Sequence, residues 1–330
     1  MDLDSSKLRR GLREAGLSDQ VIDAAWPSWW RDELAADPSG RAELRFALAR
    51  KLGVSPKGLL GERVEFVWND EAKFKHLSTE DGAQRAALTS FGVTIGRMLV
   101  RATPRPGSLE GLDAFLIREA MLTSQQFVDL GGLLALCWAV GIPVIHLRVF
   151  PLEAKSMHAM VVRVDDRFAI LLGRDASYPA PIAFTLAHEL GHAVLGHLRD
   201  APALVDLKDP ATVVEPDDQE SEADQFALSL LTGRPDPEIT TSLTSFNAPT
   251  LADAVIRAAP SYHIEPGTLA LCVAHRTGAW PMAMSALKFI YGQPGPIWKD
   301  VNAYAGTQID WGELGSESAE YLQNIMDIRG

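Results

Sequence analysis

The chain has 330 residues and a formal net charge of −12, which argues against a general nucleic-acid-binding protein. Its hydrophobic fraction of 47% is ordinary for a globular protein, and its length is sufficient for more than one domain. No apolar run approaches the ~18 residues of a membrane helix, and the acidic start, Met1-Asp2-Leu3-Asp4, does not look like a secretory signal. We therefore expect a cytoplasmic protein.

The N-terminal part of the chain reads as short helices broken by Gly and Pro, and residues 48–55 spell Leu-Ala-x-x-Leu-Gly-Val-Ser. This pattern resembles the start of an XRE-type helix-turn-helix, with Gly53 closing the first helix. The resemblance implies that Arg50, Lys51 and Lys57 contact DNA or a partner protein. Few polar side chains follow for reading base edges, so a helical module that docks a partner or packs on the rest of the chain is favoured over DNA binding.

Two longer helical patterns follow along the chain. The first covers residues 84–100, and the second covers residues 112–140. We expect the second helix to break near residues 122–124 and to be loosened at Gly131 and Gly132.

The next region changes from helical to extended character. β-Branched, alternating runs predict strands over residues 142–150, 160–164 and 167–172. Asp165 and Asp166 separate the last two runs, which is typical of a hairpin turn.

A helix after this hairpin carries His188-Glu189-Leu190-Gly191-His192. Residues four apart share a helical face, so His188 and His192 can direct two imidazoles at one point that Glu189 borders. Two nitrogen ligands and an adjacent carboxylate are what a hydrolytic zinc site needs, with the carboxylate as general base for the attacking water. A five-residue match also occurs by chance, but its place on an amphipathic helix after a hairpin favours a metal site.

A catalytic zinc site requires a third protein ligand. After a loop over residues 200–218, a helix is predicted over residues 220–231 that offers either Glu220 with Asp224 or, on its opposite face, Glu222. We favour Glu220 as the ligand, with Asp224 accepting the outer N–H of a ligand histidine and Glu222 facing solvent. Without the upstream histidines, a solvated acidic face would be the preferred interpretation.

Other polar residues are weaker candidates for this site. His197 lies five residues after His192, which rotates it off the ligand face, so we expect it to cap the helix or face solvent. The donor that would stabilise an oxyanion is not identified, and the possible residues are His146, His158, Tyr178, Tyr262 and His263.

Residues 183–231 resemble the ImmA/IrrE family of zinc metallopeptidases. The motifs that carry the resemblance are Phe-Thr-Leu-Ala-His-Glu-Leu-Gly-His over residues 184–192 and Glu-x-x-Ala-Asp-x-Phe-Ala-x-x-Leu-Leu over residues 220–231. The likeness extends from about residue 112 to about residue 282. Leu-Leu-Thr-Gly over residues 230–233 departs from the Leu-Leu-Met-Pro that often ends this helix in the family.

The resemblance implies one Zn²⁺ ion held by His188, His192 and Glu220, with Glu189 as the catalytic base. It further implies a site-specific bacterial endopeptidase that relieves repression in a stress, phage or mobile-element response. The implied partner is a protein substrate, a helix-turn-helix repressor or antitoxin-like protein encoded nearby.

We therefore predict an α+β, mostly helical fold, in which a small mixed β-sheet packs on the HExxH helix as a zincin-like core between N-terminal and C-terminal helical regions. The predicted divisions are an N-terminal helix-turn-helix-like module over residues 1–75, a helical linker region over 76–140, a metallopeptidase domain with following helices over 141–290, and a C-terminal tail over 291–330.

Two other functions stay open at this point. The chain could be a DNA-binding transcriptional regulator whose metal site is structural or sensory. It could also be an inactive peptidase fold that serves as a scaffold, although the intact Glu189 argues against that. Zn²⁺ is the default metal, and Mn²⁺ or another divalent ion is the alternative.

Overall fold

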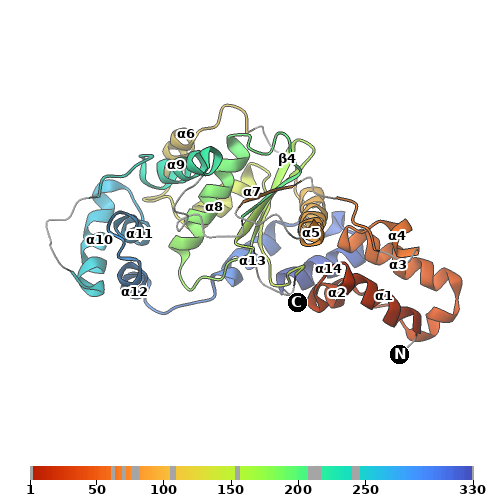
Figure 1. Ribbon diagram of the computed structural model, residues 1–330. Helices are drawn as coiled ribbons and strands as arrows, with labels where there is room; N and C mark the ends of the chain where they lie inside the picture. Colours follow the sequence, from red (N-terminus) through yellow and green to blue (C-terminus); the bar gives the residue numbers. More distant parts are fainter. Residues whose placement is uncertain are drawn as a thin grey trace.

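The computed structural model describes residues 3–60, 64–68, 72–75, 82–104, 109–152, 157–206, 217–239 and 246–328. In these ranges the fold is α+β and mostly helical, with a mixed sheet at its centre (Figure 1), so the predicted fold class is confirmed. None of the helices in these ranges combines the length and apolar character that crossing a bilayer demands.

Helices surround the sheet along most of the chain. Their bounds are α1 (Leu3–Glu14), α2 (Asp19–Ala25), η1 (Asp32–Ala36), α3 (Pro38–Leu52), α4 (Pro56–Leu60), α5 (Gly82–Arg101), α6 (Ala114–Leu122), α7 (Leu130–Ala139), α8 (Pro179–Val194), α9 (Asp218–Thr232), α10 (Ala248–Tyr262), α11 (Pro266–Thr277), α12 (Trp280–Tyr291), α13 (Ile297–Gln308), η3 (Trp311–Glu313) and α14 (Ser316–Met326).

The sheet has the strand order β1-β5-β3-β4-β2. β3 and β4 form the predicted antiparallel hairpin, and Asp165 in its turn has a φ of 57°. β5 pairs antiparallel with β3, whereas β1 is parallel to β5 and β2 is parallel to β4. The strands are β1 (Lys73–Lys75), β2 (Val144–His146), β3 (Ala159–Val164), β4 (Arg167–Leu172) and β5 (Ala203–Asp206).

Three local predictions need correction. The strand expected over residues 142–150 is only Val144–His146, because the Arg148 amide already donates to Ile325 O of α14. Part of the loop expected over residues 200–218 is β5, whose amide and carbonyl groups pair with β3. Gly132 does not loosen a helix, because it lies in the first turn of α7, where its amide donates to Asp129 Oδ1.

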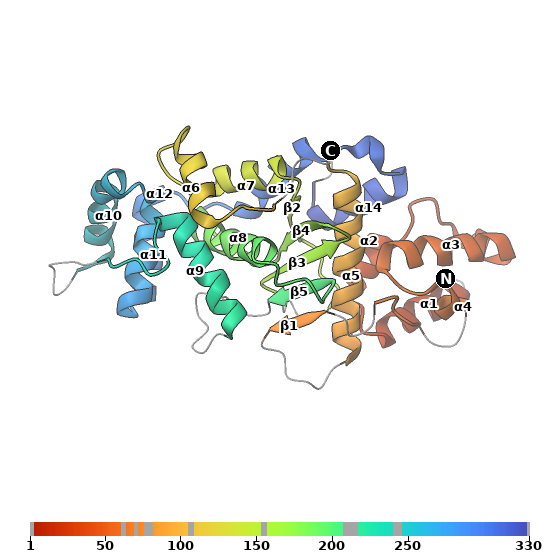
Figure 2. The ribbon, with the colours of Figure 1, turned by 90° about the horizontal axis from the view of Figure 1, so that it is seen from above.

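α5 covers one face of the sheet and α8 covers the other (Figure 2). Successive strand side chains point to opposite faces, so Met160 and Val162 join the core with α5, while Ala159 and Val161 join the core with α8. A Cβ at Gly96 of α5 would lie 2.8 Å from Val162 Cγ1, so this glycine allows the close approach of helix and sheet.

The two ends of the chain pack together beside α5 (Figure 1). α2 contacts both α3 and α14, and α14 also contacts α5. The tail predicted over residues 291–330 is therefore wrong in this part, because α14 buries Tyr321, Leu322, Ile325 and Met326 at helical spacing. α10, α11 and α12 form a separate apolar core next to α8.

Candidate metal centre

α8 places His188, Glu189 and His192 at the interior of the molecule. The helix begins with Pro179 after Tyr178, and its apolar face packs on β3 and β4. All three side chains are fully buried, with 0% exposure. A helix with such residues inside needs partners for them, because a buried charged or polar group without one is costly.

α9 supplies those partners from across the helix pair. Asp217 caps its first turn by accepting from the Glu220 amide at 3.0 Å. α9 lies close to α8 because Gly191 has no side chain: a Cβ there would be 3.1 Å from the ring of Phe226. This close packing brings the Glu220 carboxylate to the two histidines.

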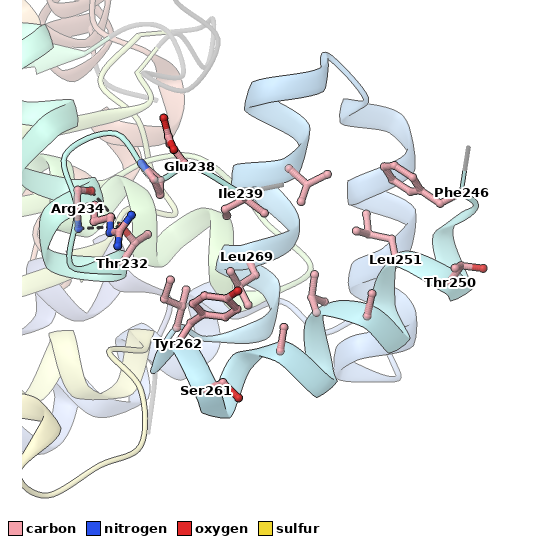
Figure 3. A pocket seen from close by; sticks show the side chains of 16 residues that line it. Thr232, Arg234, Glu238, Ile239, Phe246, Thr250, Leu251, Ser261, Tyr262 and Leu269 are labelled. Carbon is pink, nitrogen blue, oxygen red and sulfur yellow. Dashed lines mark hydrogen bonds between the residues drawn. The ribbon is translucent and has the colours of Figure 1, made fainter. Parts of the chain in front are cut away.

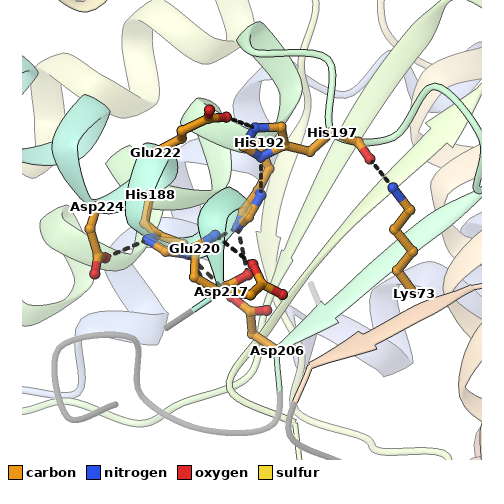
Figure 4. A network of polar contacts seen from close by, with 9 residues as sticks. All are labelled: Lys73, His188, His192, His197, Asp206, Asp217, Glu220, Glu222 and Asp224. Atoms are coloured by element: carbon orange, nitrogen blue, oxygen red, sulfur yellow. Dashed lines mark hydrogen bonds and ion pairs between the residues drawn. The ribbon is translucent and has the colours of Figure 1, made fainter. Parts of the chain in front are cut away.

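Three side chains converge at one point between α8 and α9 (Figure 4). The Nε2 atoms of His188 and His192 are 3.0 Å apart. Glu220 Oε2 is 3.4 Å from His188 Nε2, and Glu220 Oε1 is 3.5 Å from His192 Nε2. The structure thus brings together the three residues predicted as metal ligands.

A fourth donor, Asp206 at the end of β5, was not predicted. Its Oδ2 atom is 3.5 Å from His188 Nε2. With Asp206 included, the four donor atoms lie within 4.8 Å of one another, and all four residues are buried. The available signal was the short apolar run Ala203-Leu204-Val205 before Asp206, which is a strand within the expected loop.

Both histidines predicted as ligands are held through their outer ring nitrogen. His188 Nδ1 donates to Asp224 Oδ1 at 2.9 Å, the contact expected from the shared helical face of α9. His192 Nδ1 lies 2.8 Å from His197 Nδ1, and His197 Nε2 donates to Glu222 Oε2 at 2.9 Å. Such contacts fix the tautomer and orientation of a metal-binding histidine.

The solvent-facing position expected for His197 was therefore wrong, whereas Glu222 is exposed as expected, with a side-chain exposure of 61%. His197 is 6% exposed rather than solvent-facing, because Gly196 adopts a φ of 77° after α8 and turns the chain back toward His192. The carboxylate of Glu222 accepts the Nε2 hydrogen of His197, so His197 Nδ1 accepts from His192. This relay leaves the His192 Nε2 lone pair facing the centre.

The charges of the cluster show what kind of ligand fits. In the described part of the chain, neither carboxylate oxygen of Glu189 or Asp206 has a hydrogen-bond partner. Burial and the negative charge of Asp206 raise the pKa of Glu189 well above its ordinary value. Burial alone would lower the pKa of His188, but the neighbouring carboxylates of Asp206, Asp224 and Glu220 raise it well above the ordinary range. Neighbouring buried carboxylates contribute to both shifts, and a cation would offset their negative charge.

The donor distances also fit a metal ion. Bonds of ~2.0–2.1 Å in a tetrahedral site place neighbouring ligand atoms about 3.3–3.4 Å apart. The observed separations among His188, His192 and Glu220 are 3.0, 3.4 and 3.5 Å. This buried group can therefore hold a metal ion.

Neither the models of known protein families nor the curated proteins match this chain. The chemistry of the centre consequently has to be argued from its own residues.

The basic residues predicted to contact DNA or a partner lie in different surroundings. Arg50 pairs with Glu317 of α14 at 2.8 Å, and Lys57 is exposed on α4. Lys51 is 1% exposed, with its Nζ 6.0 Å from the ring centre of Tyr321. The prediction of a surface contact for Lys51 is wrong, because α14 covers that face of α3.

Of the possible oxyanion donors, His158 lies beside the centre. Its amide donates to Asp206 O at 2.7 Å, and its Nε2 is 2.9 Å from Thr185 Oγ1 of α8. Burial and the charges of Arg174 and His188 lower its pKa to about 3, so the ring is neutral. Elsewhere, His146 contacts two backbone carbonyls, Tyr178 stacks on Tyr291, and His263 caps α10.

Tyr262 lines a cavity of about 410 Å³ beside α10 and α11 (Figure 3). Its walls include apolar side chains such as Leu251, Val255 and Leu269, which belong to the separate C-terminal core. None of the described residues that line it belongs to the group of His188, His192, Asp206 and Glu220.

Proposed function

We propose that this protein is a zinc-dependent endopeptidase. The observation that carries the proposal is the convergence of two imidazole Nε2 atoms and the Glu220 carboxylate at 3.0–3.5 Å, with the buried carboxylate of Glu189 next to them. Two nitrogen donors and one carboxylate are a donor set of catalytic zinc. Zn²⁺ is favoured over Mn²⁺ because imidazole suits it better than the harder ion.

In this proposal the bound ion and Glu189 have different roles in peptide hydrolysis. A bound divalent ion supplies Lewis acidity, which acidifies water and polarises a carbonyl oxygen. Glu189 would accept the proton of the attacking water and deliver it to the leaving amine nitrogen. Its low-dielectric surroundings and the nearby Asp206 favour a carboxyl group that can hold this proton.

Asp224 and His197 would keep the two imidazoles in place during this cycle. Each contacts a ligand histidine at its outer nitrogen, at 2.9 and 2.8 Å respectively. The oriented rings keep their Nε2 atoms aimed at one point, so a bound ion would keep a fixed position relative to Glu189.

The substrate proposal comes from the resemblance to the ImmA/IrrE peptidases. It nominates a regulatory protein, a helix-turn-helix repressor or antitoxin-like protein encoded near this gene. Cutting it would relieve repression in a stress, phage or mobile-element response.

Replacing the base tests the proposal. Glu189→Gln is expected to keep metal binding and folding while cleavage falls by about 100-fold or more, since general base catalysis contributes ~10²–10⁴-fold. Cleavage is measured on the helix-turn-helix protein encoded next to this gene and on a proteome-derived peptide library. Glu238→Gln, an exposed glutamate outside the centre, is the matched control. Undiminished cleavage by Glu189→Gln would overturn the mechanism.

The second candidate is a regulator with a structural or sensory metal site. The observation in its favour is the fourth buried donor, Asp206, because structural zinc sites are closed by four protein ligands. In that case the wild-type protein cleaves neither substrate, while metal binding still changes its stability. Direct DNA contact gains no support from Lys51, which is buried.

A further inference from the structure

Asp206 has a fixed position at the end of β5. In the sheet it lies opposite Ala159 of β3, and its carbonyl accepts from the His158 amide at 2.7 Å. These backbone contacts set the direction of its side chain, which points to the histidines of α8 (Figure 4). The carboxylate is therefore placed at the centre by the sheet, independently of α9.

The cost of burying the Asp206 carboxylate is offset only in part by the His188 ring. The residue is 2% exposed, and neither carboxylate oxygen has a hydrogen-bond partner in the described ranges. Oδ2 is 3.5 Å from His188 Nε2, the same separation as between Glu220 Oε1 and His192 Nε2. Asp206 thus lies as close to a histidine Nε2 atom as Glu220 does, and Glu220 is the third predicted ligand.

Catalytic zinc sites keep one position open for water, whereas sites with four protein ligands are closed. We infer that Asp206 is a fourth protein ligand, which closes the resting metal centre and must leave it before a substrate is cut. This inference rests on the metal centre of the proposed function and adds a latent state to it. Glu189 would serve as the base next to the centre in both states.

Cobalt substitution tests this inference without a cleavage assay. Co²⁺ is bound to the metal-stripped full-length protein, and its visible spectrum is recorded before and after addition of azide, which binds only at an open position. Wild-type protein is expected to show a four-coordinate spectrum that azide leaves unchanged. Asp206→Ala and the shape-preserving Asp206→Asn are expected to respond to azide and to bind Co²⁺ about 10-fold more weakly or worse. Asp253→Ala, an exposed position on α10, is the control.

The outcomes separate the two proposals. A wild-type spectrum that shifts with azide as the variants' spectra do would overturn the fourth-ligand inference and leave the peptidase proposal standing. A closed cobalt site in wild type, with no cleavage by wild type or by either Asp206 variant, would contradict the peptidase proposal alone. Failure of Co²⁺ to bind would overturn both.

A groove lined in part by α3 and α5 supports a second, independent inference. Its volume is about 510 Å³, and it lies among α3, α5 and the turn before α14. Among the residues that the structure describes, the charged ones lining this groove are Arg50, Arg97 and Arg101. Its apolar lining includes Phe46, Val54, Val67, Trp68, Met98 and Leu314.

Two features of the groove indicate a binding surface. Phe46 is 56% exposed and Val67 is 54% exposed, and large exposed apolar groups gathered in one hollow are typical of interaction sites. Arg97 stacks over the ring of Trp68 at 4.8 Å, which holds a guanidinium at the rim. A basic rim on a chain of net charge −12 is complementary to acidic groups on a partner.

We propose that this groove docks an acidic, amphipathic segment of a partner protein. Apolar side chains of the segment would cover Phe46 and Val67, while its carboxylates would meet Arg97 and Arg101. Nucleic acid fits less well, because phosphates alone leave the apolar floor uncovered, and Lys51 is not at the surface.

The probe is a fluorescein-labelled helical peptide built from Leu, Phe and Glu, titrated into the full-length protein. We expect binding that weakens at least about 10-fold in Arg101→Glu and in Phe46→Ala, while the control Arg10→Glu, on α1, binds as wild type does. A matched peptide with Lys in place of Glu should not bind. Equal binding of the Lys peptide, unchanged binding by both groove variants, or displacement of the peptide by duplex DNA would overturn the proposal.

Discussion

Two sites of buried charge, the surroundings of Lys51 and the cluster around His188, differ in how their charge is offset. Lys51 lies under α14, where burial lowers its pKa and the carboxylates of Glu317 and Glu320 act in the opposite direction. At the candidate metal centre, Glu189, Asp206 and Glu220 are all buried together with the two imidazoles of His188 and His192.

The contrast separates a structural charge from a functional one. The chain supplies both signs of charge around Lys51, so the carboxylates of α14 offset part of the cost of burying this lysine. Around His188 the chain places several buried carboxylates, whose charge a bound cation would offset. The treatments and variants described below each change either the cluster around His188 or the surroundings of Lys51.

Removal of the ion has the largest expected effect. With free Zn²⁺ at ~1,000 times its dissociation constant, a site that exists only in the folded state stabilises folding by about 4 kcal/mol. We expect that stabilisation to disappear in EDTA, as measured by chemical denaturation with and without the chelator. An identical unfolding free energy in both conditions would show that the buried carboxylates do not depend on a cation.

Lys51→Met should raise the free energy of unfolding by about 1–3 kcal/mol, because burial disfavours the charge of Lys51 more than Glu317 and Glu320 favour it. Zn²⁺ affinity should stay as in wild type, since α3 contributes no donor. Urea unfolding and calorimetric Zn²⁺ titration measure the two quantities. A loss of metal affinity in this variant would break the separation between the two sites.

His197→Ala should weaken metal binding by ~10–100-fold, the range found when the partner of a ligand histidine is removed. The reason is that His192 loses the contact of 2.8 Å that orients its ring. His275→Ala, exposed in the last turn of α11, serves as control. Equal affinities for the two variants would reduce His197 to a packing residue.

Glu222→Gln should have the smallest effect, lowering metal affinity by no more than about fivefold, or about 1 kcal/mol. Its side chain is 61% exposed, so water replaces much of its contact with His197. The same titration checks it, and an effect larger than that of His197→Ala would contradict the order of the relay.

The sequence predicted best those features that depend on local periodicity. His188 and His192 share a face through helical spacing alone, and Glu220 and Asp224 do the same on α9. The hairpin and the break after α6 also follow from local signals.

Features that depend on pairing across the chain were missed. Asp206 reaches the centre because a strand of four residues pairs with β3, which no local pattern of that length specifies. His197 lies beyond the end of α8, where the spacing rule of a helix no longer applies. Lys51 is buried by α14, more than 260 residues away along the chain, so its own surroundings in sequence look like a surface.

The metal content of the purified protein tests the central claim most directly. After dialysis against metal-free buffer, we expect one tightly held divalent ion per wild-type chain, identified by mass spectrometry of the elements. A double variant, His188→Ala with His192→Ala, should hold none while keeping its helical circular dichroism. Wild-type protein that retains no ion and binds none on titration with Zn²⁺, or a double variant with the same content, would contradict the account.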